Sequence, residues 1–369
     1  MEPGHAATVA SLTRDDFAPA PRVDRSLLRR SLLTLSVAVV VAVAVITLVP
    51  GLASLRSRFA HGDPAWLALG AVLKVLSGLS YVAAFRSVFC RGMRWRVSTQ
   101  IGLSELGANA VLPTGGAGGL ALGAWALRRG GMDGGHIARR SVAFFLLTSL
   151  PNVLGVAIIG FGLAAGVFAG RASLALTLVP ALVATAAIVI TIAGGRWAAT
   201  AGRRRAARSG PASRVARALQ TLADGVAEVL SLLRGRDLWL LCGLVGYLAF
   251  DVMILWATFH AFGSVPPLAI IWIGYLIGEL GGLVPLPGGI GGLDAGLVGT
   301  LALYHVSFAA ATAAVLAYRA LALVVPTVLG AVAFVLLRAS LAREALEISS
   351  CQPGGEVEVI GRGSVRLTA

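Results

Sequence analysis

The hydrophobic positions of this 369-residue chain fall into long uninterrupted runs. A helix that crosses the ~30 Å hydrocarbon core of a bilayer needs about 20 mostly apolar residues. Runs of that length are predicted to be transmembrane helices, and they cover 32–50, 64–89, 141–168, 172–194, 238–262 and 308–337. The pattern therefore predicts an all-α polytopic membrane protein.

Two further apolar regions, 97–127 and 268–304, are interrupted in the middle by glycine and proline. Proline removes a backbone donor, and glycine releases the helix. Unpaired backbone groups cost several kcal/mol each in lipid, so such breaks persist only where protein or a wet cavity covers them. Each region is predicted to form either a re-entrant hairpin or a pair of complete spans.

Composition agrees with a membrane protein and excludes soluble enzyme folds. Hydrophobic residues make up 57% of the chain and charged residues only 13%, against about 25% charged in soluble domains. The net charge of +14 would indicate a nucleic-acid partner in a soluble protein. Here the arginines gather in loops, so we expect no nucleic-acid partner.

Arginine counts predict the orientation. The first 30 residues, the loop after 64–89, segment 128–140 and the connector 195–237 are rich in arginine, whereas the intervening loops hold only Arg56, Arg58 and Arg171. Loops rich in Lys and Arg face the cytoplasm. We therefore expect a cytoplasmic tail over 1–30, a transmembrane domain over 31–338 with the basic cytoplasmic connector 195–237, and a disordered cytoplasmic tail over 339–369. Within the connector, 211–234 reads as an amphipathic helix on the inner membrane surface.

The cysteines and histidines predict no metal or redox chemistry. Cys90, Cys242 and Cys351 are odd in number and far apart, which fits neither a disulfide framework nor a zinc site. The five histidines are scattered. We expect no metal, no cofactor and no catalytic residue.

The two broken regions resemble each other. Glu105 and Pro113 recur as Glu279 and Pro287 at one offset, and the doubled glycines after each proline recur one residue closer. The copies would cover about 64–168 and 238–337, separated so that they face opposite ways. Inverted repeats with broken helices are typical of transporters whose substrate site lies near the midplane. The alternative is an old duplication kept only for packing.

Charged residues inside the apolar regions are the sharper signal, because each costs about 2.5–3.5 kcal/mol to insert. They are Lys74, Glu105, Asp251, Glu279, Asp294 and Arg319. One interpretation is charge pairing that holds the bundle together, with Lys74 and Asp251 as a pair. The other is functional: cations that meet an anionic headgroup, and carboxylates that carry a coupling proton or recognise an amine.

The glycine-rich breaks also allow two interpretations. Half-helices beginning near Gly118 and Gly291 would present free N–H groups and a positive dipole end, which suit a phosphate. Alternatively, the glycines only permit close helix packing.

Segment 285–297, Pro-Leu-Pro-Gly-Gly-Ile-Gly-Gly-Leu-Asp-Ala-Gly-Leu, resembles the PGGLGxxEAAL signature of the flippase-like, lysylphosphatidylglycerol synthase transmembrane-region family. Asn109, Pro113 and the Gly115-Gly116 pair resemble that family's earlier N-x-x-x-P-x-x-G element, and Arg319 falls where the family has an arginine on its last long helix. Asp294 stands in place of the usual Glu. The resemblance covers about 30–340 and implies movement of a lipid between leaflets. The aminoacyl-transferase domain of larger relatives is missing, so we do not expect lipid synthesis.

The sequence thus predicts a bacterial inner-membrane lipid flippase whose partner is a lipid with an anionic or phosphate headgroup. The alternatives are a membrane-embedded enzyme and a non-transporting scaffold in envelope lipid metabolism. The lipid, the energy coupling and the oligomeric state stay open. The candidate substrate-binding residues are Lys74, Glu105, Asn109, Pro113, Gly115, Gly116, Asp251, Glu279, Pro287, Gly288, Gly289, Gly291, Asp294 and Arg319.

Overall fold

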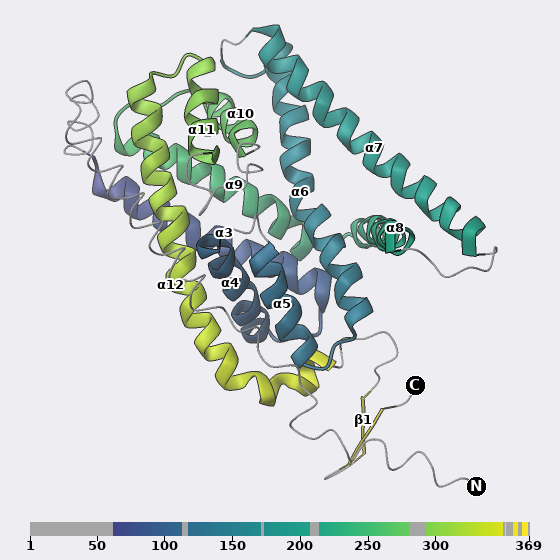
Figure 1. Cartoon of the computed structure of the whole chain (residues 1–369). Coiled ribbons are helices and arrows are strands. Elements are labelled where there is room, and N and C mark those ends of the chain that lie inside the picture. Colours follow the sequence, from purple (N-terminus) through teal and green to yellow (C-terminus); the bar gives the residue numbers. More distant parts are fainter. Residues whose placement is uncertain are drawn as a thin grey trace, which may run out of the picture.

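The computed structural model is a helical bundle built around one long helix, α12 (Figure 1). It describes residues 62–112, 117–170, 173–206, 214–279, 292–349, 351, 357–360 and 364–367. The predicted span 32–50 and both glycine–proline breaks lie outside the described residues. The helices are α3 (Pro64–Phe89), α4 (Trp95–Val111), α5 (Ala117–Arg129), α6 (Gly134–Ala164), α7 (Leu174–Ala206), α8 (Arg214–Arg234), α9 (Leu238–Ala261), α10 (Leu268–Glu279), α11 (Gly292–Leu303) and α12 (Phe308–Ser349).

Among the described residues, α3, α6, α7, α9 and α12 are long and apolar enough to cross a membrane. This confirms the polytopic all-α class, and α3 coincides with the predicted span 64–89. The predicted start of α6 was too late, because the Asp133 side chain accepts the backbone N–H of His136 at 2.9 Å and caps the helix before Gly134. Helices α7 and α12 likewise continue past their predicted ends.

The two broken regions are hairpins of short helices, α4–α5 and α10–α11. Helix α5 has 13 residues, and α10 and α11 have 12 each. At 1.5 Å per residue these arms are only about 18–20 Å long, well short of a ~30 Å core. Helix α4 is longer, with 17 residues. The short arms favour re-entrant hairpins over paired complete spans. The two hairpins lie along opposite halves of α12 (Figure 1).

Helices α3 and α9 pack closely along their length and run antiparallel. The backbone N–H of Asp63 donates to the Ala261 carbonyl at 2.9 Å at one end. At the other end the Arg91 guanidinium lies 3.1 Å from the Asp237 carboxylate. Helix α12 packs across α3, α4 and α9, so these helices form the centre of the bundle.

Helix α8 lies crosswise to this bundle: it is seen end-on in Figure 1, where α12 runs along the picture. Its described apolar positions, including Val226 and Leu233, face α6 and α7. Arg140 of α6 and Glu228 of α8 form an ion pair at 3.2 Å. The predicted amphipathic helix is thus present.

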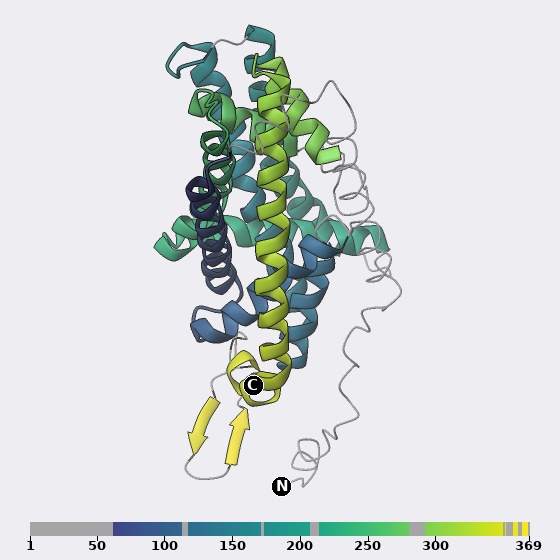
Figure 2. The same ribbon diagram turned by 90° about the vertical axis from the view of Figure 1, so that its left-hand side faces the viewer.

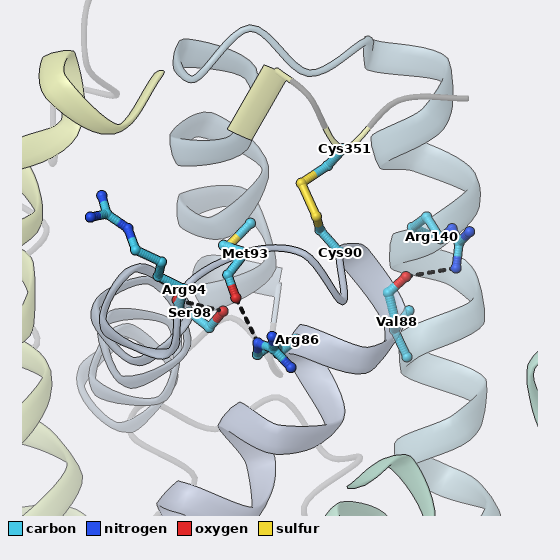
Figure 3. Close-up of a disulfide and its surroundings, with 8 residues drawn as sticks. All are labelled: Arg86, Val88, Cys90, Met93, Arg94, Ser98, Arg140 and Cys351. Atoms are coloured by element: carbon cyan, nitrogen blue, oxygen red, sulfur yellow. Dashed lines mark hydrogen bonds between the residues drawn. A yellow bond between two sulfur atoms is a disulfide. The ribbon is translucent and has the colours of Figure 1, made fainter. Parts of the chain in front are cut away.

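The C-terminal region corrects two predictions. The tail 339–369 was expected to be disordered, but α12 continues to Ser349, and Val357–Ile360 (β1) pairs antiparallel with Ser364–Leu367 (β2) (Figure 2). The cysteines were expected to form no disulfide. Instead Cys90 and Cys351, which lie 261 positions apart in the chain, are bonded, with their Cα atoms 5.5 Å apart (Figure 3).

The longer α12 and the disulfide have one physical cause. The end of α12 packs under the turn between α5 and α6, where an added Cβ at Gly130 would meet Ile348 at 2.6 Å. Ile348 is fully buried there. That contact carries the chain beyond α12 to the α3–α4 loop, where Cys90 lies, and a sequence pattern does not reveal such a long-range approach.

Candidate functional site

The centre of the bundle holds a buried ion pair. The Lys74 ammonium on α3 lies 2.7 Å from Oδ1 and 3.0 Å from Oδ2 of Asp251 on α9. Both side chains are about nine-tenths buried. The pairing that the sequence allowed as one interpretation is therefore present, and it spans the two central helices.

Tyrosines extend this pair toward the second hairpin. The Tyr275 hydroxyl of α10 donates to Asp251 Oδ2 at 3.4 Å, and the Tyr318 hydroxyl of α12 donates to the Tyr275 oxygen at 3.2 Å. Glu279, the last residue of α10, interacts with Tyr275 and lies within electrostatic range of Lys74 and Asp251. Four helices thus contribute to one polar network.

Arg319 and Asp294 form a second ion pair beside this network. The Arg319 Nε atom on α12 lies 3.7 Å from Asp294 Oδ1 near the start of α11. Glu279 is also within electrostatic range of Arg319. The pair therefore closes the network at the point where α11 begins. We define the central polar network as Lys74, Asp251, Tyr275, Glu279, Asp294, Tyr318 and Arg319.

Glu105 occupies the first hairpin. It is 1% exposed and accepts the Tyr81 hydroxyl of α3 at 2.8 Å. Its side chain fills the space above Gly123 of α5, where an added Cβ would collide with it. Among the described residues no Lys or Arg forms an ion pair with Glu105. The two repeat-related acids thus have different surroundings, since Glu279 lies among cations.

A tyrosine contact connects the first hairpin to the central polar network. The rings of Tyr81 and Tyr247 lie 5.4 Å apart. Tyr247 precedes Asp251 by one helical turn on α9, and its carbonyl accepts the Ser77 hydroxyl at 3.3 Å. Polar groups therefore continue from Glu105 across the α3–α9 contact to Lys74.

Asn109 closes the first hairpin. Its side-chain oxygen accepts the backbone N–H of Gly119 at 2.7 Å, near the start of α5. An added Cβ at Gly119 would collide with the Glu105 carbonyl, so only glycine allows this approach of α5 to α4. Gly119 and Gly123 thus serve the close packing of α5 on α4, whereas Gly115 and Gly116 lie outside the described residues.

The structure brings together Lys74, Asp251, Glu279, Asp294 and Arg319, and it places Glu105 and Asn109 in the other hairpin. The remaining candidates lie outside the described residues, namely Pro113, Gly115, Gly116, Pro287, Gly288, Gly289 and Gly291. Sequence reasoning missed the tyrosines. Buried Tyr residues need a hydrogen-bond partner, so Tyr275 and Tyr318 in apolar helices could have been predicted to join a polar network.

Comparison with known proteins places this arrangement in a family. A model of the lysylphosphatidylglycerol synthase transmembrane region matches residues 33–330, most of the chain. The chain belongs to this family. No curated protein matches it. Membership in the lysylphosphatidylglycerol synthase transmembrane-region family and the helical architecture identify a membrane protein linked to lipid metabolism, in contact with the bilayer.

Within this family member, the matched region contains all the charged residues of both hairpins. It ends at Gly330, where α12 packs on Gly107 of α4. The α4–α12 contact continues beyond the matched region, since the Ser340 hydroxyl of α12 donates to Gln100 Oε1 of α4 at 3.0 Å. The matched region thus holds both hairpins and the central polar network.

Proposed function

We propose that this protein is a lipid flippase, which moves a lipid or lipid-linked headgroup between leaflets without covalent chemistry. The central polar network carries this proposal. Ionisable groups inside a membrane domain are costly and mark substrate or ion pathways. Here three charged helix positions, Lys74, Asp251 and Arg319, meet the end of a re-entrant hairpin, where a headgroup could pass.

The arrangement of helices supports an inverted repeat. Helix α3 packs on α9, its counterpart in the other copy. Helix α4 packs on α12, and their counterparts α10 and α6 also pack on each other. The hairpins lie on opposite halves of the molecule (Figure 1). Paired hairpins that enter from opposite faces would give the lipid access from each leaflet in turn.

We further propose an inner-membrane location in a bacterium, with both termini in the cytoplasm. Contacts bring the arginine-rich segments together at one end of the bundle. Arg91, after α3, pairs with Asp237, just before α9. The turn between α5 and α6 packs on Ile348 near the end of α12. The disulfide at the same end favours the opposite orientation, because disulfides persist mainly in oxidising compartments. The many arginines carry this assignment, and in a reducing compartment the two cysteines would be thiols.

The cations differ in their suitability for a phosphate. The Lys74 side chain is 10% exposed and the Arg319 side chain is 22% exposed. Arginine also binds phosphate through a planar fork. We therefore assign the headgroup phosphate to Arg319, and to Glu279 and Asp294 the recognition of a proton or amine.

Reconstituted vesicles test the proposal. Fluorescent phosphatidylglycerol is incorporated in both leaflets, dithionite bleaches the outer leaflet, and the further loss of fluorescence measures translocation. We expect the unmodified chain to translocate lipid and Asp294→Ala and Arg319→Ala to slow it. Arg343→Ala is the matched control, because this exposed arginine lies on the same helix beyond the network. Translocation by both network variants at the unmodified rate would show that the site is wrongly assigned.

A further inference from the structure

An open groove of about 420 Å³ runs along the outer side of the contact between α3 and α9. Its walls include Leu76 and Leu79 of α3, Trp95 of α4, and Trp239, Cys242 and Phe250 of α9. Leu79 is 45% exposed and Trp239 is 60% exposed. The lining is almost entirely apolar, so the groove suits a hydrocarbon chain.

The floor of the groove is formed by a close helix contact. An added Cβ at Gly243 of α9 would lie 2.7 Å from the Ser80 carbonyl and the Ala84 backbone nitrogen of α3. Helix α9 therefore approaches α3 closely here, and larger side chains of both helices form the walls. Glycine at 243 allows this approach.

One end of the groove has the chemistry of a membrane interface. The Trp95 and Trp239 rings pack edge to face with centroids 5.1 Å apart, and tryptophan favours the headgroup level. The Arg86 guanidinium lies 4.8 Å from the centroid of the Trp95 ring. Its Nε donates to the Met93 carbonyl at 2.6 Å (Figure 3), which fixes it there.

Arg86 keeps donors for a ligand. A guanidinium has five N–H groups, and in the described part of the chain its hydrogen bond to Met93 uses one of them. The arginine is neither fully buried nor ion-paired among those residues. A phosphate at the tryptophan end of the groove would find a positive charge and open donors.

The length of the groove matches one leaflet. From Trp239 to Phe250 along α9 the helix rises about 16 Å, roughly half of the ~30 Å hydrocarbon core. A chain that lies from the tryptophans to Phe250 would therefore reach from the interface to the midplane.

We propose that this groove binds an anionic phospholipid, with its phosphate at Arg86 and one acyl chain along Leu79 and Phe250. Apolar length and a cation at the interface end together select this occupant over a neutral lipid. The site lies on the outside of the bundle and does not require that the protein translocate lipid. Its failure and the failure of the flippase proposal are therefore separate outcomes.

Cys242 is a built-in reporter, because it lines the groove, is exposed and is not disulfide-bonded. The full chain is purified in detergent, and alkylation of Cys242 by N-ethylmaleimide is followed at the peptide level by mass spectrometry. Phosphatidylglycerol or phosphatidylcholine is added at equal mole fraction. We expect phosphatidylglycerol to slow alkylation about fivefold relative to phosphatidylcholine, the size of one arginine–anionic lipid interaction.

Three matched variants define the site. Arg86→Gln should abolish the difference between the two lipids, whereas Arg91→Gln, which removes the same charge from the neighbouring loop, should keep it. Val245→Cys in a Cys242→Ser background places a thiol on an α9 position that is 61% exposed and outside the groove. At this position phosphatidylglycerol and phosphatidylcholine should slow alkylation equally.

Three results would overturn the proposal. Equal protection of Cys242 by both lipids would show no selection for an anionic headgroup. Equal losses in Arg86→Gln and Arg91→Gln would show diffuse attraction to the loop. A Cys242 thiol that fails to react without added lipid, while the Val245→Cys thiol reacts, would show that protein covers the groove.

Discussion

The Lys74 ammonium contacts both carboxylate oxygens of Asp251, at 2.7 and 3.0 Å, although the residues lie 177 positions apart in the chain. The contact joins the middle of α3 to the middle of α9, the helices that begin the two halves of the bundle. A structural pair and a pair that takes part in transport make different predictions for single and double variants.

Single replacements at this pair should be strongly destabilising. Lys74→Met or Asp251→Leu leaves a buried charge without its partner, which costs about 3–5 kcal/mol. The double variant Lys74→Met/Asp251→Leu removes both charges and should recover most of the stability. Thermal unfolding in detergent measures each step.

Transport by the double variant then separates the two roles. If the charges take part in moving the headgroup, as we propose, the double variant is folded but slow in the vesicle assay. A double variant that is stable and translocates lipid at the unmodified rate shows that the pair only holds the bundle. A double variant as unstable as the singles contradicts the pairing itself.

Glu105 and Tyr81 give a second prediction, in the first hairpin. Tyr81→Phe removes the hydroxyl that donates to the buried carboxyl at 2.8 Å, and an unsatisfied buried acceptor costs about 1–3 kcal/mol. Glu105→Gln keeps an acceptor for that hydroxyl and should be nearly as stable as the unmodified chain. If Glu105 carries a coupling proton, one of the two roles that the sequence allows for these carboxylates, Glu105→Gln should slow translocation, because glutamine cannot exchange a proton.

The outcome is read from stability and transport together. Thermal unfolding should fall for Tyr81→Phe and hold for Glu105→Gln, while the vesicle assay should show the larger defect in Glu105→Gln. If Glu105→Gln translocates lipid normally, Glu105 serves the packing of α4 against α5 and carries no proton.

Local pattern was enough to predict the helices of this fold. The run of apolar residues in 64–89 matches α3, since a membrane helix depends on its own length and hydropathy. The glycine and proline residues within 97–127 and 268–304 likewise predicted where the two hairpins lie. Helix ends were less predictable: Asp133 starts α6 through one side-chain hydrogen bond.

Long-range contacts needed the structure. The sequence suggested Lys74 with Asp251 because opposite charges inside membranes find each other. It gave no reason to join Cys90 to Cys351, because nothing local reports that α12 continues and brings its end to the α3–α4 loop. It also gave no reason to link Tyr275 with Tyr318 on helices far apart in the chain.

The disulfide yields a third prediction, which also tests the orientation. A bond between cysteines 261 positions apart adds about 2–4 kcal/mol of stability in typical cases. Oxidised protein should therefore unfold at a higher temperature than protein reduced with dithiothreitol, and Cys351→Ser should remove that difference. Equal unfolding temperatures before and after reduction would contradict a stabilising bond.

Trapping of thiols in growing cells gives the compartment. N-ethylmaleimide is added to intact cells before lysis, and peptides are then analysed for alkylated cysteine. With this end of the bundle in the cytoplasm, as proposed, Cys90 and Cys351 should be alkylated as thiols and should form the bond only after purification. Recovery of the intact disulfide from trapped cells would place this end in an oxidising compartment and reverse the proposed orientation.

The contact between α4 and α12 gives the last prediction. An added Cβ at Gly330 would lie 2.6 Å from the Gly107 Cα atom and from the Leu103 carbonyl, and one at Gly107 would lie 2.8 Å from the Gly330 Cα atom. Because both neighbours are backbone, the helices must move apart, so Gly330→Ala or Gly107→Ala should cost about 1–3 kcal/mol.

Gly299→Ala on α11 is the control, since nothing lies within 4 Å of its added Cβ. It should leave stability unchanged or raise it, because alanine favours a helix by up to about 1 kcal/mol over glycine. Thermal unfolding of the three variants measures these effects, and equal unfolding temperatures for all of them would show that α4 and α12 do not approach through these glycines.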